Sequence, residues 1–427
     1  MAKEITIIEL VNILKPFNNV VVSMAAAEPK LFLNHLSHIK HSIHILNCLP
    51  LENVYSEDKT LKNIHFDSLF YSSHMRELEL KYHQSSYIPS HLHQAGINRM
   101  EVFPPDVFIG TGTKDASEKF VSLSLSNVYE IEAFKRSKIK VIEINRQMPY
   151  VYGDHIVKYE DIDYTIHVDY KPNVLSYKAT DERDKIIGKL IATHIEDDST
   201  LQFGIGSIPN AVANALEGKK NLGIHTEMLS DGLVKLIKNG TVNGSKKTIF
   251  KNKHVCSFIL GTEDVYKYVD NNEDILVMNA NYVNDPYVIG QNHKQVSINT
   301  TIEIDLTGQC NSESLNNKHY SGTGGQVDTA IGAQRSKNGK SFIALHSTTF
   351  KNSADGTKQL TSKIVSKFQN GQSVTFSRND IDYVVTEYGI VKLKGLTIKE
   401  RILKLISIAH PDFRESLLDG AKKTYHI

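Results

Sequence analysis

The sequence predicts an α/β protein of two domains whose sheets are mainly parallel. Segments typical of strands alternate with segments of helical periodicity, starting with an amphipathic helix over residues 4–15 and buried strands over residues 20–23 and 43–48. This alternation is typical of parallel β-α-β units. At 427 residues the chain is also too long for one ordinary hydrophobic core, which favours two domains.

A polar, proline-containing stretch without periodicity covers residues 170–178. We place the domain boundary there, between a first domain of residues 1–176 and a second of residues 177–427. Thr180 is expected to cap the next helix, with Ile186 and Ile187 on its buried face. The last helix is expected over residues 397–409, and strands of the second domain are expected over residues 201–203, 257–260, 275–278, 302–306, 342–345, 374–376 and 383–385.

The composition of the chain limits which kinds of binding partner and which cellular compartment we expect. The 49 basic and 48 acidic residues give a net charge of +1, and no basic run is present, so no nucleic-acid partner is predicted. Cys48, Cys256 and Cys310 lie far apart, which predicts no disulfide framework and fits a reducing cytosol. No apolar run approaches the roughly 20 residues of a membrane helix. We therefore expect a cytoplasmic protein with no membrane contact.

The stretch over residues 199–232 holds the strongest functional pattern. A short strand precedes Gly204 and Gly206, and Pro209 suits the first turn of a following helix. A strand, a glycine turn and a helix N-terminus together present backbone N–H groups to an anion or oxyanion. Residues 222–225 form a second strand-like piece that leads to Glu227. We interpret Glu227 as a nucleophilic carboxylate, and a helix-capping acid is the alternative from the residues alone.

Four loops that follow predicted strands are expected to meet at one edge of a sheet, because ligands bind at the carboxyl ends of parallel strands. They cover residues 204–209, 226–227, 279–286 and 322–326. The glycine-rich residues 110–115 lack the lysine and hydroxyl of a phosphate loop, and they are interpreted as a surface loop. His91 and His93 have the spacing of two metal ligands, but with no third ligand apparent no metal site is predicted.

Several motifs occur in a specific order along the chain. They are residues 104–106 (Pro-Pro-Asp), 145–149, 152–154, 203–209 (Phe-Gly-Ile-Gly-Ser-Ile-Pro), 225–232 (His-Thr-Glu-Met-Leu-Ser-Asp-Gly), 304–309, 322–326, 380–389 and 406–414. With these motifs the sequence resembles the acetyl-CoA hydrolase/transferase family of class I CoA-transferases, in particular its 4-hydroxybutyrate and butyrate types. The resemblance covers nearly the whole chain.

The resemblance implies two related open α/β domains of the CoA-transferase fold, with the active site between them. It implies that Glu227 is the catalytic glutamate and that a backbone N–H at Gly325 helps to form an oxyanion hole. The amide that holds the acyl oxygen is assigned to Asn284, with Asn281 and Asn279 as alternatives. The positions assigned to substrate binding are Gly204, Gly206, Pro209, Gly322, Gly324, Gln326, Ser347 and Lys351.

The implied activity is that of an acyl-CoA:carboxylate CoA-transferase with ping-pong kinetics, acting on acetyl-CoA and a short-chain acid such as 4-hydroxybutyrate or butyrate. A carboxylate that attacks a thioester forms a mixed anhydride and CoA thiolate, which then combine into a glutamyl-CoA thioester. This chemistry needs no metal and no tightly bound cofactor, since the CoA thioester is the substrate. Water attacking the anhydride would make the protein an acetyl-CoA hydrolase. A catalytically inactive CoA-binding protein is a further alternative.

The resemblance also implies a homodimer, and the sequence departs from the family pattern at two places. Residues 107–119 are expected to form a longer loop where the family has a shorter glycine turn. Ala27 stands where a glycine is expected before Glu28 and Pro29. Both departures lie in the first domain, on the side expected to shape the acyl pocket, so they bear on the substrate more than on the reaction.

Overall fold

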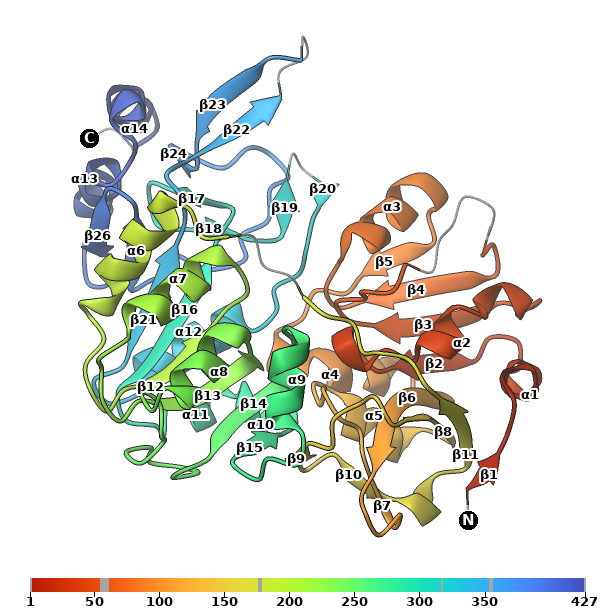
Figure 1. Ribbon diagram of the computed structural model, residues 1–427. Helices are drawn as coiled ribbons and strands as arrows, with labels where there is room; N and C mark the ends of the chain where they lie inside the picture. The colour runs from red at the N-terminus through yellow and green to blue at the C-terminus, as the bar shows by residue number, and fades with distance from the viewer. Residues whose placement is uncertain (1, 54–60, 176–178, 316–317, 353–355, 426–427) are drawn as a thin grey trace.

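The computed structural model describes residues 2–53, 61–175, 179–315, 318–352 and 356–425. Two large sheets form two halves that lie side by side, the N-terminal half in red to yellow and the C-terminal half in green to blue (Figure 1). Helices connect successive strands in both halves, and most strand pairs are parallel. The predicted α/β class with mainly parallel sheets is thus confirmed.

The first sheet has the strand order β1-β11-β8-β6-β2-β3-β4-β5, with all of these pairs parallel, and β7 and β10 extend it by antiparallel pairing beside β6. Its strands are β1 (Lys3–Glu4), β2 (Asn19–Val22), β3 (Ile43–Asn47), β4 (Ile64–Ser68), β5 (Ser85–Tyr87), β6 (Val107–Lys114), β7 (Phe120–Ser122), β8 (Ile139–Asn145), β10 (Ile156–Lys158) and β11 (Tyr164–Val168). The helices of this half are α1 (Ile7–Ile13), η1 (Ala25–Ala27), α2 (Lys30–Leu33), η2 (Leu36–His38), α3 (Ser73–Tyr82), η3 (Leu92–Gln94), α4 (Ala95–Val102), α5 (Glu130–Arg136) and η4 (Tyr159–Asp161).

The second sheet has the order β26-β25-β21-β16-β12-β13-β14-β15-β9, and only the β25–β26 pair is antiparallel among its described strands. Its strands are β9 (Tyr152–Gly153), β12 (Thr200–Phe203), β13 (Gly223–Leu229), β14 (His254–Ile259), β15 (Ile275–Val277), β16 (Gln295–Thr300), β21 (Lys340–Ala344), β25 (Tyr383–Thr386) and β26 (Gly389–Lys392). Its helices are α6 (Glu182–Ala192), α7 (Ser207–Ala215), α8 (Asp231–Lys238), α9 (Glu263–Val269), α10 (Ala280–Val283), α11 (Pro286–Ile289) and α12 (Gln326–Arg335).

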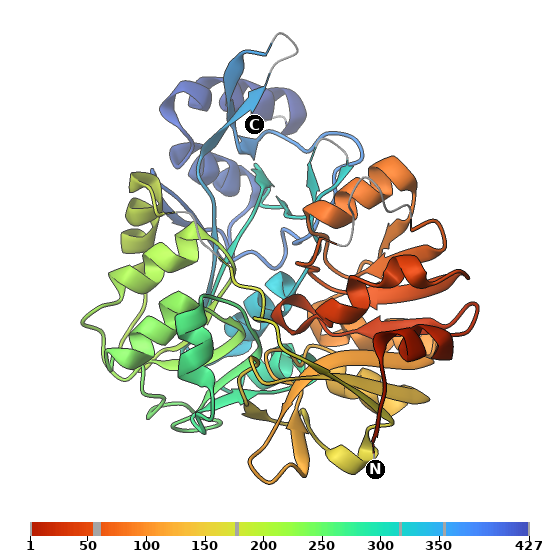
Figure 2. The ribbon, with the colours of Figure 1, turned by 45° about the vertical axis from the view of Figure 1, so that its right-hand side comes forward.

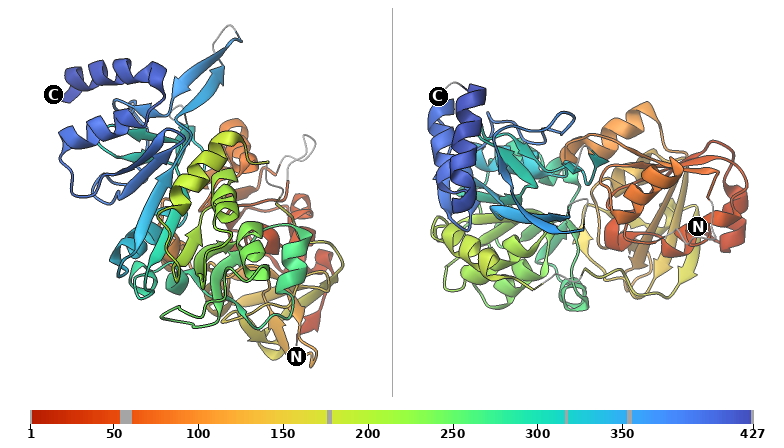
Figure 3. Two further views of the ribbon diagram at one scale, coloured as in Figure 1. Left: turned by 60° about the vertical axis from the view of Figure 1, so that its left-hand side comes forward. Right: turned by 90° about the horizontal axis from the view of Figure 1, so that it is seen from above.

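Smaller elements complete the C-terminal half, and its last two α-helices lie on the side away from the first half (Figure 3). The hairpin of β22 and β23 projects from the body of the protein, and its two strands pair only with each other (Figure 1). These elements are β17 (Glu303–Asp305), β18 (Cys310–Asn311), β19 (Ser314–Leu315), β20 (Lys318–His319), β22 (Thr348–Asn352), β23 (Lys358–Ser362), β24 (Ile364–Val365), α13 (Ile398–Ser407), η5 (Pro411–Phe413) and α14 (Arg414–Tyr425).

The two halves share one hydrophobic core, and the described part of the segment that joins them contacts both, since Asn173 Nδ2 donates to Glu52 Oε1 and the Leu175 N–H donates to the Gly261 carbonyl oxygen. Buried Cys48, Leu69 and Leu92 of the first half belong to the same cluster as Met228 and Ala280 of the second. The connecting segment after β11 crosses between the halves (Figure 2). The predicted boundary between residues 176 and 177 lies outside the described residues. Among those that are described, no helix is both long enough and apolar enough to cross a bilayer.

The interpretation of residues 110–115 as a surface loop, and of residues 107–119 as a long loop, is wrong. Residues 107–114 form β6, which is buried between β2 and β8, and a turn then leads to β7. A Cβ atom on Gly110 would lie 2.7 Å from Ser23 Oγ, and one on Gly112 would lie 2.7 Å from Ser122 O. The two glycines therefore leave room for neighbouring atoms that pack closely against this strand.

The first helix of the second half begins one residue later than predicted. Asp181, and not Thr180, caps α6, because its side chain accepts from the Asp184 N–H while the Asp184 side chain accepts from the Asp181 N–H. This reciprocal pair is a capping box. Ile187 is buried as predicted, but Ile186 is 43% exposed, because only one stripe of the helix faces the sheet.

The C-terminal part of the prediction is correct in places. Helix α13 confirms the helix over residues 397–409, but it is not the last one, since α14 follows it. Residues 374–376 contribute an isolated bridge between Phe376 and Cys310 in place of the predicted strand. The central strand β16 is absent from the predicted strands. It contains the buried polar residues Gln295, Ser297 and Asn299, so its sequence is typical of an exposed segment.

Candidate active site

Glu227 lies near the carboxyl end of β13, which continues two residues past it to Leu229. The strand is therefore longer than the predicted piece over residues 222–225, and Glu227 is not a helix cap. Its Oε2 atom accepts a hydrogen bond of 2.9 Å from Asn284 Nδ2. The backbone N–H of Gly325 also donates to this carboxylate. The three residues assigned to catalysis thus come together, although they are distant in the sequence.

Gly325 is a position where only glycine fits. A Cβ atom there would lie 1.8 Å from Glu227 Oε2 and 2.2 Å from Asn284 Nδ2. Gly324 before it has a positive φ of 54°, which glycine adopts without strain. Gly325 is also the N-cap of α12, so the free N–H groups of that helix start beside the carboxylate.

The structure distinguishes Asn284 from the two alternative asparagines. Ser257 Oγ on β14 donates to Asn284 Oδ1 at 3.0 Å, which turns Nδ2 towards Glu227. Asn279 instead caps α10, where its side chain accepts from the N–H of Asn281. Buried His225 further fixes this turn, because its Nε2 atom lies 2.9 Å from the carbonyl oxygen of Val283.

The surroundings of Glu227 favour its neutral form more than water does. Burial raises its pKa from 4.5 to about 7, and the nearby Asp328 carboxylate acts in the same direction. The hydrogen bonds from Asn284 and Gly325 oppose this rise, because they stabilise the ionised form. A carboxylate with a pKa near neutrality and few water contacts has the properties of a catalytic nucleophile.

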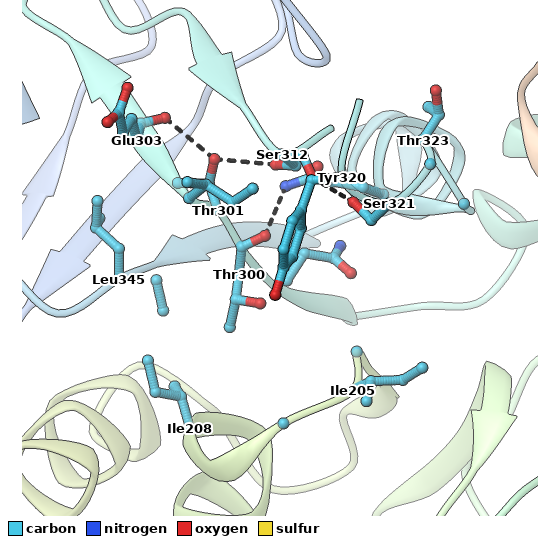
Figure 4. A pocket seen from close by; sticks show the side chains of 18 of the residues that line it. Ile205, Ile208, Thr300, Thr301, Glu303, Ser312, Tyr320, Ser321, Thr323 and Leu345 are labelled. Atoms are coloured by element: carbon cyan, nitrogen blue, oxygen red, sulfur yellow. Dashed lines mark hydrogen bonds between the residues drawn. The ribbon is translucent and has the colours of Figure 1, made fainter. Parts of the chain in front are cut away.

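A cavity of about 540 Å³ lies beside Glu227, at the carboxyl ends of β12, β16 and β21. In Figure 4, Ile205 and Ile208 line one wall, while Thr300, Thr301 and Leu345 line the opposite wall. Of the residues assigned to substrate binding, those that line the cavity are Gly204, Gly206, Gly322, Gly324, Gln326 and Lys351. The loops after several strands therefore form one site, as the topology predicts.

Two residues assigned to substrate binding are not in the cavity wall. Ser347 is fully buried, and its N–H and Oγ both donate to the Glu387 carboxylate at 2.8 Å. Pro209 is buried in the first turn of α7, where it packs inside the protein. The assignment of Ser347 and Pro209 to substrate binding stays a prediction, and in this structure both residues shape the loops that carry other cavity residues.

The sequence analysis missed several residues that line the cavity. Phe70 reaches it from the first half, and a Cβ on Gly322 would lie 2.9 Å from the Phe70 ring. Lys363 is half-buried, and removal of its ammonium group from water lowers its pKa to about 8. Its Nζ atom lies 3.4 Å from Thr301 O, while Lys351 Nζ lies 3.5 Å from Glu303 Oε1. No spacing or motif marks these residues, because tertiary structure alone brings them together.

Within the part of the chain described here, the group of three side chains with a geometry suitable for a metal includes neither His91 nor His93. The group there with a geometry suitable for a metal is Asp181, Asp184 and His346. However, Asp184 Oδ1 already accepts hydrogen bonds from Ser207 Oγ at 3.0 Å and from His346 Nε2 at 2.8 Å. These contacts make the group a hydrogen-bonded support for the loop at the start of α7.

Two α/β sheets with a half-buried glutamate facing a glycine loop between them define a structure of the CoA-transferase class. The 4-hydroxybutyrate coenzyme A transferase of Clostridium kluyveri is 36% identical over 428 residues, 99% of this chain and 98% of the relative. The crystal structure of RipA from Yersinia pestis superposes with a TM-score of 0.90 at 32% identity, covering 100% of this chain and 98% of that one. A 4-hydroxybutyrate CoA-transferase structure from Porphyromonas gingivalis has a TM-score of 0.80 at 33% identity, covering 99% and 98%.

The model of the acetyl-CoA hydrolase/transferase C-terminal domain matches residues 261–421. The chain belongs to the acetyl-CoA hydrolase/transferase family.

Proposed function

We propose that this chain is an acyl-CoA:carboxylate CoA-transferase that works through a covalent intermediate on Glu227. One observation carries the proposal: Glu227 lies beside a cavity and its carboxylate accepts hydrogen bonds from both Asn284 and Gly325. Full-length similarity to CoA-transferases supports the same activity.

The reaction begins when an ionised Glu227 oxygen attacks the thioester carbonyl. The resulting oxyanion collapses, the carbon–sulfur bond breaks, and CoA leaves as a thiolate from an acyl-glutamyl anhydride. The thiolate then attacks the Glu227 carbonyl, so that the donor acid leaves as a carboxylate and glutamyl-CoA remains. An incoming carboxylate reverses these steps and leaves as the new acyl-CoA, which restores Glu227.

The observed donors suit the steps in which the Glu227 carbonyl itself is attacked. Asn284 Nδ2 and the Gly325 N–H already contact the Glu227 carboxylate, so they are in place when negative charge develops on its oxygen. Loss of one such preorganised donor typically costs about 3–4 kcal/mol of transition-state stabilisation. Because both donors are fixed by the fold, little reorganisation accompanies the reaction.

We further propose acetyl-CoA with a short-chain acid such as 4-hydroxybutyrate or butyrate as the substrate pair, with no tightly bound cofactor. The names of two full-length relatives support 4-hydroxybutyrate, and the name of a relative that matches 79% of this chain, a probable butyrate:acetyl-CoA CoA-transferase, supports butyrate and acetyl-CoA. Lys351 in the cavity wall supplies a positive charge for the CoA phosphates. A cytoplasmic location is supported by three buried cysteines that form no disulfide. A homodimer rests on the family resemblance alone.

An exchange assay tests the proposed function. The protein is incubated with acetyl-CoA and either ¹³C-labelled butyrate or 4-hydroxybutyrate, and both acyl-CoA products and free CoA are followed by mass spectrometry. The transferase forms labelled acyl-CoA with parallel double-reciprocal plots, and Glu227→Gln forms none. Release of CoA that needs no acceptor would replace the proposal with a hydrolase. Absence of turnover with several acyl-CoAs and acids would contradict an enzymatic role.

A further inference from the structure

The short helix η3 (Leu92–Gln94) of the first half lies against the glycine loop of the second. The Leu92 N–H donates to the carbonyl oxygen of Gly324 at 3.2 Å. Gly324 directly precedes Gly325, whose N–H contacts Glu227. A segment distant in the sequence from the catalytic residues therefore has a direct hydrogen bond to the loop on which the proposed chemistry depends.

His93 makes two more contacts with the same region. Its backbone N–H donates to Asp328 Oδ2 at 3.1 Å, and its Nδ1 atom lies 2.8 Å from Asp328 Oδ1. Asp328 is in the first turn of α12, three residues after Gly325, and is only 2% exposed. Both carboxylate oxygens of a buried aspartate are thus bonded by one residue of the other half.

The His93–Asp328 pair interacts electrostatically with Glu227. The Asp328 carboxylate raises the pKa of Glu227, so the two acids interact. The hydrogen bond that the His93 ring donates to the Asp328 carboxylate raises the pKa of His93, which favours an imidazolium that compensates the aspartate charge. His91 is the other basic group near this aspartate, with Nδ1 at 3.9 Å from Asp328 Oδ1, and Asp285 adds a further negative charge near His93.

From these contacts we infer that His93 is a positioning residue, which holds the start of α12 through Asp328 so that the Gly325 N–H stays aimed at Glu227. This inference rests on the proposed function of Glu227. His93 does not line the cavity, so it acts through Asp328 and the glycine loop. The reaction needs donors placed to within a fraction of an ångström, and small displacements of such groups are costly to the rate.

Two replacements of His93 by side chains of similar size distinguish a positioning role through the hydrogen bond to Asp328 from a role in packing alone. His93→Asn keeps an N–H donor near the place of Nδ1, whereas His93→Leu fills similar space without a donor. His91→Leu is the matched control, since His91 is nearly half exposed and lies farther from Asp328. Kinetics with acetyl-CoA and butyrate are normalised to the number of active sites, counted by the CoA adduct on the protein. Amide hydrogen exchange over residues 320–330 is measured on the same samples.

We expect His93→Leu to lower kcat by about tenfold or more, the effect of losing a hydrogen bond to a buried charge, with the KM for acetyl-CoA within about threefold. We expect faster amide exchange over residues 320–330 in this variant. His93→Asn and His91→Leu should stay within about threefold of the wild type in kcat. Equal kcat per active site in His93→Leu, or equal losses in His93→Leu and His93→Asn, would overturn the inference.

The exchange measurement keeps this test separate from that of the proposed function. If the wild type forms no CoA adduct, the proposed function fails, and unchanged exchange in His93→Leu would then reject the positioning role as well. If His93→Leu folds poorly, the comparison moves to His93→Gln, whose amide lies near the place of Nε2 and not of Nδ1. The inference then requires His93→Gln to lose more activity per active site than His93→Asn.

Discussion

Replacing the nucleophile should abolish turnover and at the same time stabilise the protein. Burial of Glu227 raises its pKa from 4.5 to about 7, so the folded protein holds a proton that the unfolded chain releases. Between pH 4.5 and about pH 7 the folded protein binds more protons than the unfolded chain does. The free energy of unfolding therefore falls as the pH rises through this range. The penalty is fully present above about pH 7 and absent well below pH 4.5.

The size of this effect follows from the same pKa values. A change from 4.5 to about 7 corresponds to at most about 3 kcal/mol of destabilisation at pH 8. Because Glu227 lines an open cavity and keeps some contact with water, we expect about 1–3 kcal/mol. Glu227→Gln removes the charge and retains an oxygen that can accept from Asn284 and Gly325.

Equilibrium urea unfolding of the wild type and Glu227→Gln at pH 8 and pH 5 measures the effect. We expect the variant to be more stable at pH 8 by about 1–3 kcal/mol, and the difference to shrink to about 1 kcal/mol or less at pH 5. The low-pH pair is the internal control, since it removes most of the charge difference. A variant that is less stable than the wild type at pH 8, or a stability difference that does not depend on pH, would refute the conclusion that the Glu227 charge destabilises the folded protein.

Three further predictions concern activity. In single-turnover experiments the rate of adduct formation should fall by about tenfold for each pH unit below about 7, since only ionised Glu227 attacks; a flat profile from pH 5 to 8 would contradict this. Asn284→Leu should lower kcat by about 10²–10³ with little change in KM, because it removes one donor to Glu227, and steady-state kinetics with acetyl-CoA decide it. Gly325→Ala should abolish adduct formation in a folded protein, because the new Cβ would overlap the Glu227 carboxylate. Circular dichroism tests whether the variant is folded, and intact-protein mass spectrometry tests whether it forms the adduct.

The sequence could predict those parts of the site that lie on contiguous motifs. Residues 203–209 contain a strand, a glycine turn and a helix start that the structure reproduces, and residues 225–232 place Glu227 correctly beside that turn. These local patterns depend on neighbours in the chain, which explains their success. The sequence does not decide which of Asn279, Asn281 and Asn284 contacts Glu227, because the orientation of Asn284 depends on a hydrogen bond from Ser257 on another strand.

The remaining parts of the site depend on packing between the two halves. Phe70 and His93 approach the glycine loop from the first half, and nothing in their local sequence indicates that contact. The strand β6 was mistaken for a loop because its two glycines are typical of loops, whereas here they make room for Ser23 and Ser122. Such requirements of space are properties of the folded protein, and composition does not reveal them.

The most direct test of the central claim is intact-protein mass spectrometry after incubation with acetyl-CoA and no acceptor acid, followed by peptide mapping. The account predicts a CoA adduct on wild-type protein, located at Glu227, sensitive to borohydride reduction and absent from Glu227→Gln. An adduct at another residue, or turnover of acetyl-CoA by Glu227→Gln at the wild-type rate, would contradict the account.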